Sequence, residues 1–210
     1  MDNRCILTLS FSLSVLLWSA TGAASDVPDG YRRVAHEAGV PAEALYSLSL
    51  AESSKKIKPG LRRPWPWTIN VAGTGYRYAS RQEAFDALNA FARRYPLKRI
   101  DVGIAQTNIG WHGHRFASRW AAFEPYTNLR VAAQILRECY DRSPGSWDRA
   151  IGCYHHPAGG THARTYRAIV RRNLNELPTF RQQGGTAPAS ANVASLVWVD
   201  PEQPHKENRR

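Results

Sequence analysis

The chain has 210 residues, of which 43% are hydrophobic and 21% are charged. This balance is typical of a folded domain with one core, and it excludes a wholly disordered chain. The formal net charge of +11 indicates either an anionic partner or a solvated basic surface.

The first 25 residues have the pattern of a secretory signal peptide. Arg4 precedes an apolar run over residues 6–18, and small residues follow over 20–25. The run is too short for a permanent membrane span, and no second long apolar stretch follows it. We therefore expect an exported, periplasmic protein with no permanent membrane span. For such a protein the anionic cell wall is a better match than nucleic acid or lipid.

Two helices are predicted at the start of the mature chain. Residues 31–38 form the first pattern, which Gly39 closes. Pro41 is suited to the first position of the second helix, which continues to about Ser53.

The next segment predicts a small β element. Residues 55–63 are interpreted as a basic connector. Alternation over residues 67–71 and 76–78, on either side of a turn at 72–75, predicts a β-hairpin.

Helical patterns return after the hairpin. Ser80 begins an S-x-x-E capping box for a helix that Pro96 stops. Thr127 and Ser146 are expected to cap a long and a short helix. Residues 100–111 are interpreted as irregular.

A last helix is predicted to end before Pro178, and the fold class is mainly α with one small hairpin. Residues 178–210, rich in Gln, Gly, Ala, Pro and Ser, predict a disordered tail. An isolated apolar patch at residues 196–199 lies within it.

Cys139 and Cys153 remain after removal of a signal peptide that would contain Cys5. In an exported chain an isolated pair of cysteines usually forms a disulfide, so we predict one. Two free buried thiols are the alternative.

Glu52 is the first candidate for catalysis. The helical repeat puts it on one face with Leu45, Leu48 and Ser49, at the C-terminal end of a mostly apolar stripe. Burial beside apolar groups and the negative end of a helix dipole both raise the pKa of a carboxyl group. Such a group can donate a proton near neutral pH. Without further signals, a glutamate at a helix end is more commonly a surface residue.

Three segments resemble, in order, the motifs of the soluble lytic transglycosylase family. Ala51-Glu52-Ser53 resembles the family's Glu-Ser pair. Gly-Ile-Ala-Gln-Thr-Asn at residues 103–108 resembles its Gly-Leu-Met-Gln-type segment, and Ala-Ile-Gly-Cys-Tyr at 150–154 resembles its Ala-Tyr-Asn-type helix. The likeness spans roughly residues 27–177. The chain is also similar to the small transglycosylases of conjugation and type IV secretion systems.

The resemblance implies a lysozyme-like (goose-type) helical domain over residues 26–177 that cleaves the MurNAc-GlcNAc β-1,4 bonds of peptidoglycan and leaves 1,6-anhydro-MurNAc. It implies glycan strands as substrate, components of a secretion or conjugation machine as partners, and no cofactor. It carries the acid role onto Glu52. It carries substrate-binding or acid-positioning roles onto Ser53, Gln106, Asn108, Tyr154 and His155.

The sequence departs from the family pattern in three places. About fifty residues separate Glu52 from Gly103, and we interpret them as an insertion beside the cleft. Ile104 and Ala105 replace a larger pair, and His155 stands where the family has Asn.

Three alternatives remain open. A lysozyme-type hydrolase would pair Glu52 with a second carboxylate, but the spacing of Asp101, Glu124 and Asp148 marks none of them as that partner. The others are a non-catalytic wall-binding component of a secretion apparatus and an exported nucleic-acid binder, which no motif supports. A penicillin-binding enzyme is disfavoured, because the S-x-x-K at residues 53–56 lacks a K-T-G and the chain is short for that fold. The histidines lack metal-ligand spacing, so we predict no metal.

Overall fold

The computed structural model describes residues 27–177. The predictions of a signal peptide at 1–25, a tail at 178–210 and a patch at 196–199 lie outside the described residues. The described part is mainly helical, with seven α-helices and two small antiparallel sheets. Within it, no helix is both long and apolar enough to cross a bilayer.

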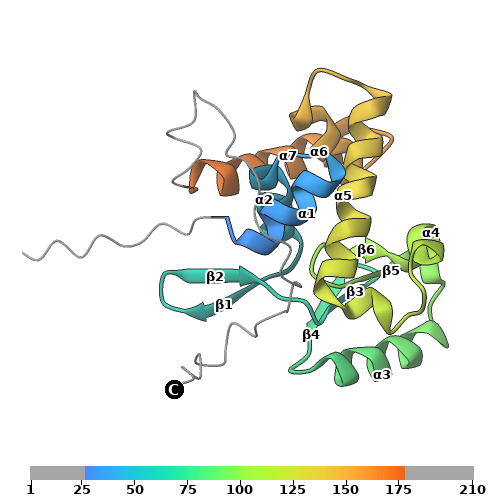
Figure 1. Cartoon of the computed structure of the whole chain (residues 1–210). Coiled ribbons are helices and arrows are strands. Elements are labelled where there is room, and N and C mark those ends of the chain that lie inside the picture. The colour runs from blue at the N-terminus through green and yellow to red at the C-terminus, as the bar shows by residue number, and fades with distance from the viewer. Residues whose placement is uncertain (1–26, 178–210) are drawn as a thin grey trace, which may run out of the picture.

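Five helices surround one hydrophobic core and form the helical half of the molecule (Figure 1). They are α1 (Asp29–Ala38), α2 (Ala42–Ser53), α5 (Pro125–Arg142), α6 (Trp147–His155) and α7 (Gly160–Asn175). Helix α2 is the central one, since every residue from Ala44 to Leu50 is buried. The sequence predicted one apolar stripe on α2, but contacts with α1, α6 and α7 cover it on several sides.

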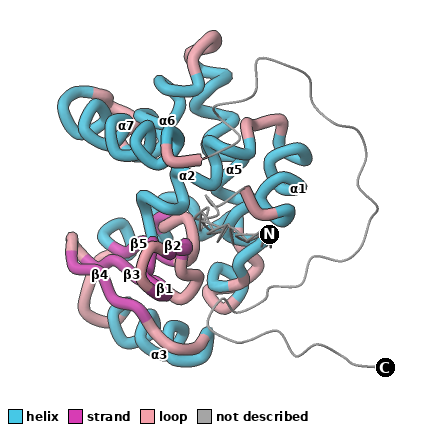
Figure 2. Tube along the Cα trace, turned by 90° about the vertical axis from the view of Figure 1, so that its left-hand side faces the viewer, coloured by secondary structure: helices cyan, strands magenta, loops and turns pink. Residues whose placement is uncertain are grey.

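The second half is built on a four-stranded antiparallel sheet with its own core. Its strands, in the order β4-β3-β5-β6, are β4 (Thr74–Arg77), β3 (Thr68–Val71), β5 (Ile100–Val102) and β6 (Thr107–Asn108). Helix α3 (Arg81–Ala92) lies along this sheet, and α5 extends from the helical half to reach it (Figures 1 and 2). The hairpin predicted from residues 67–78 is therefore confirmed as β3 and β4.

Two sequence interpretations in this region are wrong. The segment 55–63 is not a connector but a second hairpin, of β1 (Ser54–Lys58) and β2 (Leu61–Pro64). The segment 100–111 is not irregular, because it contains β5, β6 and α4 (Ile109–His112). Lysine-rich edge strands and strands of two or three residues carry little hydrophobic alternation, so the sequence pattern does not indicate a strand in either segment.

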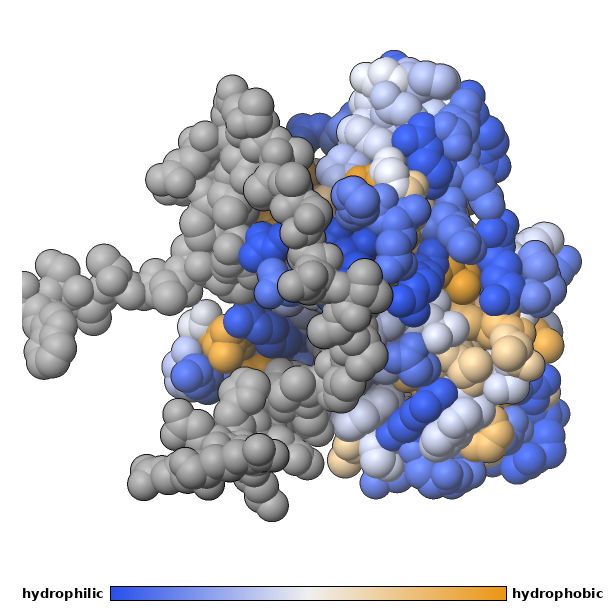
Figure 3. All heavy atoms as spheres, in the orientation of Figure 1, coloured by the Kyte–Doolittle hydropathy of each residue, from blue (hydrophilic) through white to orange (hydrophobic). Residues whose placement is uncertain are grey.

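Short 3-10 turns complete the sheet half. They are η1 (Leu97–Arg99), η2 (Gly113–Arg115) and η3 (Ala121–Phe123). On the face drawn in Figure 3, hydrophilic residues dominate over the helical half, whereas apolar residues reach the surface near α3 and α4.

The helix caps follow the sequence at three of five positions. Gly39 ends α1 with a left-handed backbone, and Ser80 and Ser146 accept hydrogen bonds from the third residue of their helices. Thr127 is not a cap, because Glu124 accepts from the amides of residues 126 and 127 and Pro125 fills the first helical position. Pro41 caps α2 instead of occupying its first turn.

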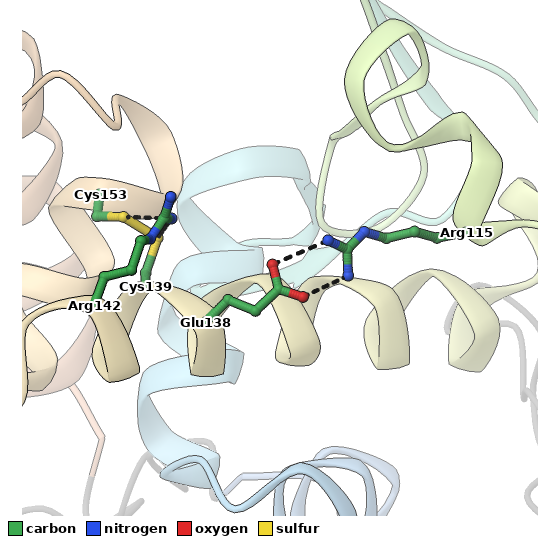
Figure 4. The surroundings of a disulfide bond; sticks show 5 residues. All are labelled: Arg115, Glu138, Cys139, Arg142 and Cys153. Atoms are coloured by element: carbon green, nitrogen blue, oxygen red, sulfur yellow. Dashed lines mark hydrogen bonds and ion pairs between the residues drawn. A yellow bond between two sulfur atoms is a disulfide. The ribbon is translucent and has the colours of Figure 1, made fainter.

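The predicted disulfide is confirmed. Cys139 on α5 and Cys153 on α6 are bonded, with their Cα atoms 5.8 Å apart. The Arg142 side chain donates to both sulfur atoms, at 3.1 and 3.2 Å (Figure 4). Further along α5, Glu138 accepts two hydrogen bonds from Arg115, which ties η2 to the same helix (Figure 4).

Candidate active site

A cavity of about 780 Å³ lies where the helical half meets the sheet half. Side chains from α2, β5, α4, α5 and α6 all border it. Its lining is Glu52, Asn70, Asp101, Gln106, Thr107, Asn108, Trp111, His112, Ile135, Tyr154, His155, His156, Pro157 and Ala158. The three sequence segments singled out above, 51–53, 103–108 and 150–154, therefore converge on one place.

Glu52 borders this cavity from the C-terminal end of α2, and its side chain is 14% exposed. Burial raises the pKa of Glu52 to about 8, and the negative charge of Asp101 adds to the effect. The hydroxyl of Tyr166 opposes it by donating to Glu52 Oε1 at 2.6 Å. At neutral pH Glu52 therefore carries a proton and can act as a general acid.

Tyr166 and His155 both lie beside the Glu52 carboxyl, and Tyr166 donates a hydrogen bond to it. Tyr166 comes from α7 and is buried, and its ring stacks on the His155 ring at 4.2 Å with the planes 3° apart. His155 Nδ1 lies 4.0 Å from Glu52 Oε1. Burial, followed by the nearby His156 and His162, lowers the pKa of His155. His155 is thus a neutral neighbour of the carboxyl at neutral pH.

Ser53 lies beneath the cavity floor and does not border it. It is fully buried, and its hydroxyl donates to the Ile104 carbonyl at 2.6 Å and accepts from the Trp65 amide at 3.2 Å. This geometry corresponds to the acid-positioning role that the resemblance implied and not to contact with a ligand, because Ser53 joins the end of α2 to the segment carrying Gln106.

Gln106 and Tyr154 border the cavity, and each donates hydrogen bonds to backbone carbonyls. Gln106 has a left-handed backbone, and its amide nitrogen donates to the carbonyls of Gly103 and Thr68. The Tyr154 hydroxyl donates to the Ala105 carbonyl at 2.8 Å, and its ring packs against both cores. Gln106 closes the turn at residues 103–106, and Tyr154 links this turn to α6.

Asn128 anchors the same turn from below. Its side chain accepts from the Ala105 amide and donates to the carbonyls of Val102 and Ala122. Gly103 has a φ of 86°, and a Cβ there would lie 2.3 Å from the Asn128 amide. A larger residue at 103 would therefore be strained twice, by its own backbone and by the buried amide.

Asp101 is the carboxylate that the sequence did not mark. It borders the cavity from β5, accepts from Asn108 at 2.8 Å, and has a pKa raised by burial. A strand of three residues gives no signal that its side chain faces a helix end some fifty residues away in the chain. The sequence also did not mark Tyr166 or Trp111 as site residues, because both are far from Glu52 along the chain.

Asn108 borders the cavity, yet its side chain is engaged within the protein. Its carbonyl accepts from the amides of Gly110 and Trp111, and its nitrogen donates to Asp101 and to the Lys98 carbonyl. It therefore acts first as the cap of α4.

Among residues 27–177, no three His, Cys, Asp or Glu side chains meet in a way that could hold a metal ion. Comparison of the chain with family models finds no match, and comparisons with curated proteins and with solved structures find no significant match. The arrangement of Glu52 and its neighbours is thus the basis for any statement of function.

Proposed function

We propose that the protein is a lytic transglycosylase that cleaves the glycan strands of peptidoglycan. The observation that carries the proposal is the Glu52 carboxyl, which is largely buried, accepts a hydrogen bond from Tyr166 and borders a cavity of about 780 Å³. Burial raises its pKa to about 8, so it can donate a proton at neutral pH. The helical half around a buried central helix and the small sheet across the cavity are compatible with a lysozyme-like fold. The resemblance of segments 51–53, 103–108 and 150–154 to the family's motifs gives the substrate.

The mechanism uses Glu52 twice. Its proton passes to the glycosidic oxygen as the bond to C1 of the MurNAc ring breaks, and the N-acetyl group shelters the cation that develops there. The Glu52 carboxylate then takes the proton of the C6 hydroxyl, and O6 bonds to C1 to close the 1,6-anhydro ring. Tethering favours this step, because the C6 hydroxyl already belongs to the reacting sugar. No water is consumed.

Tyr166 contributes to the second step. Its hydroxyl bond stabilises the Glu52 carboxylate that remains after the first proton transfer. Without a donor, a buried carboxylate would be costly to form. The same bond fixes which carboxyl oxygen faces away from Tyr166 and toward the substrate.

A lysozyme-type hydrolase is the second candidate, and Asp101 favours it. Asp101 borders the cavity together with Glu52 and interacts with it electrostatically. A carboxylate across the sugar ring could activate water, as in inverting glycosidases. The hydrogen bond from Asn108 and the raised pKa make Asp101 a possible base of this kind.

Two further features of the proposal depend on the sequence. The signal-peptide pattern supports export to the periplasm, where the wall is the substrate. The likeness to conjugation and type IV secretion enzymes supports local wall opening for such an apparatus. Peptidoglycan and the components of that apparatus would then be the partners, without a cofactor, a metal or nucleic acid.

The deciding experiment is digestion of purified peptidoglycan by the mature protein, followed by mass analysis of the muropeptides. We expect ends that are lighter by one water than hydrolytic ends and that resist borohydride reduction. Uniformly reducible ends would mean the hydrolase. Absence of lysis by the folded wild-type protein would overturn both and leave a wall-binding role.

Glu43→Gln is the matched control for Glu52→Gln in this assay. Glu43 lies in the first turn of the same helix and does not border the cavity. Lysis should disappear with Glu52→Gln and persist with Glu43→Gln. Equal lysis by the two variants would move the acid elsewhere.

A further inference from the structure

Trp111 has a surface position that its own fold does not explain. It is 58% exposed, the highest fraction among the large hydrophobic side chains of residues 27–177. It borders the same cavity as Glu52, from the short helix α4 on the sheet side. An indole left in water costs free energy that contact with a ligand would recover.

The backbone that carries Trp111 is held tightly. Asn108 accepts from the Trp111 amide at 3.1 Å while it donates to the Lys98 carbonyl at 3.0 Å. A Cβ on Gly110 would lie 2.3 Å from the Lys98 backbone nitrogen. Glycine at 110 therefore allows α4 to approach η1 closely, and Asn108 fastens the two together.

Lys98 then fixes the indole ring itself. Its Nζ atom lies 3.9 Å from the Trp111 ring centroid, the geometry of a cation–π contact. Trp111 lines the cavity, whereas Lys98 does not. The ring is thus exposed and held in place before any ligand arrives, which lowers the entropy lost on binding.

We propose that Trp111 is a stacking platform for one N-acetylhexosamine ring of the glycan strand, with Asn108, Gly110 and Lys98 as the residues that position it. A pyranose ring has an apolar face of C–H groups that matches a flat indole, and the polar edges of the sugar then meet the polar cavity lining. The inference rests on the proposed function for its substrate class. Trp111 is a binding residue in this account and takes no part in proton transfer.

Trp120 provides the matched control. It is also exposed, at 37%, and also lies under a cation, since the Arg81 guanidinium is 4.2 Å from its ring centroid. It does not border the cavity, and its ring also packs edge-to-face on Phe85, with the centroids 5.3 Å apart. Removal of the Trp120 indole should therefore disturb folding at least as much as removal of the Trp111 indole, and only Trp111 should affect glycan binding.

The test measures binding of chitotetraose, a soluble β-1,4 oligomer of N-acetylglucosamine, by calorimetry. The protein is the full mature chain carrying Glu52→Gln, so that nothing is cleaved. Adding Trp111→Ala should raise Kd by about tenfold or more, as loss of an aromatic anchor commonly does. Trp111→Phe should lose less, because a smaller ring still stacks. Trp120→Ala should stay within about twofold of the parent.

Equal Kd values for the Trp111→Ala and Trp120→Ala proteins, both with parental melting temperatures, would overturn the platform. In an otherwise active chain, Trp111→Ala should raise KM for peptidoglycan while kcat is largely kept. A loss of kcat alone would likewise overturn it. Glu52-dependent lysis with no effect of Trp111→Ala would refute the platform and leave the proposed function intact. Trp111-dependent binding without lysis by the wild type would support the platform and overturn the proposed function.

Discussion

The two sides of the cavity place their carboxyl groups in different surroundings. The helical side presents Glu52, whose carboxyl is largely buried, with a hydroxyl partner and a neutral histidine beside it. The sheet side presents Asp101, whose pKa is also raised by burial, while a hydrogen bond from the Asn108 amide lowers it in part. Two carboxylates that face one cavity are thus given different protonation tendencies by their surroundings.

Under the proposed function, this difference assigns the chemistry to the helical side and glycan binding to the sheet side. A proton donor needs a low-polarity setting, and the buried central helix α2 supplies it. A glycan needs a flat apolar surface, and the sheet side supplies one with Trp111, which Asn108 positions. Neutralising one carboxyl group at a time tests this difference between the two sides.

The largest expected effect comes from neutralising the two carboxyl groups in turn. Glu52→Gln removes the transferable proton, so lysis should fall by at least about a hundredfold. Asp101→Asn keeps the shape of the sheet side, so under transglycosylation lysis should fall by less than about tenfold. Turbidity loss of a peptidoglycan suspension measures both. Equal losses of a hundredfold or more would make Asp101 a catalytic partner and favour the hydrolase.

A second prediction concerns the covalent link on the helical side. Changing both Cys139 and Cys153 to Ala should lower the free energy of unfolding by roughly 3 kcal/mol, because the unfolded chain loses its loop constraint. Urea denaturation of the oxidised wild type and of the double variant measures the difference. A smaller loss in the reduced wild type than in the double variant would contradict this origin.

Glu52 should also make the helical side less stable as the pH rises. Its pKa is raised to about 8, so between its ordinary pKa and 8 the folded protein keeps a proton that the unfolded chain releases. The free energy of unfolding of the wild type therefore falls as pH rises through this window. Glu52→Gln avoids the loss and should exceed the wild type by at least about 1.4 kcal/mol at pH 8, the equivalent of one pKa unit. Parallel stability curves from pH 5 to 8 would contradict the raised pKa.

The smallest expected effect is that of Tyr166→Phe. Loss of the hydroxyl removes a bond that stabilises the Glu52 anion, so the pKa of Glu52 should rise further. Activity should fall by about threefold to tenfold, the usual net contribution of one intramolecular hydrogen bond. The alkaline limb of kcat/KM should move to higher pH. A limb that moves to lower pH would mean that another group titrates there.

Local signals predicted the helices well because their determinants lie within a few residues. Gly39, Ser80 and Ser146 each mark a boundary that the structure confirms. Thr127 failed as a cap because Glu124 followed by Pro125 offers the same acceptor three residues earlier.

The site was predictable only in part, and for a related reason. Glu52 followed from its helix face and from the neighbouring motif. Asp101 and Trp111 reach the cavity, and Tyr166 reaches Glu52, through strand pairing and helix packing between distant segments. The buried hydroxyl of Ser53 could be read from the motif as a site residue, but its partners at Ile104 and Trp65 could not.

The contact between Gly103 and Asn128 has a consequence for random mutagenesis. Neither residue borders the cavity, but together they hold the turn that links β5 to Gln106. In a library selected for lysis, both positions should be depleted as severely as Glu52. The two kinds of failure separate by yield, since variants at 103 and 128 should be lost to proteolysis whereas Glu52 variants accumulate as intact protein. Abundance measured alongside lysis would thus divide a list of intolerant positions into those that form the enzyme and those that operate it.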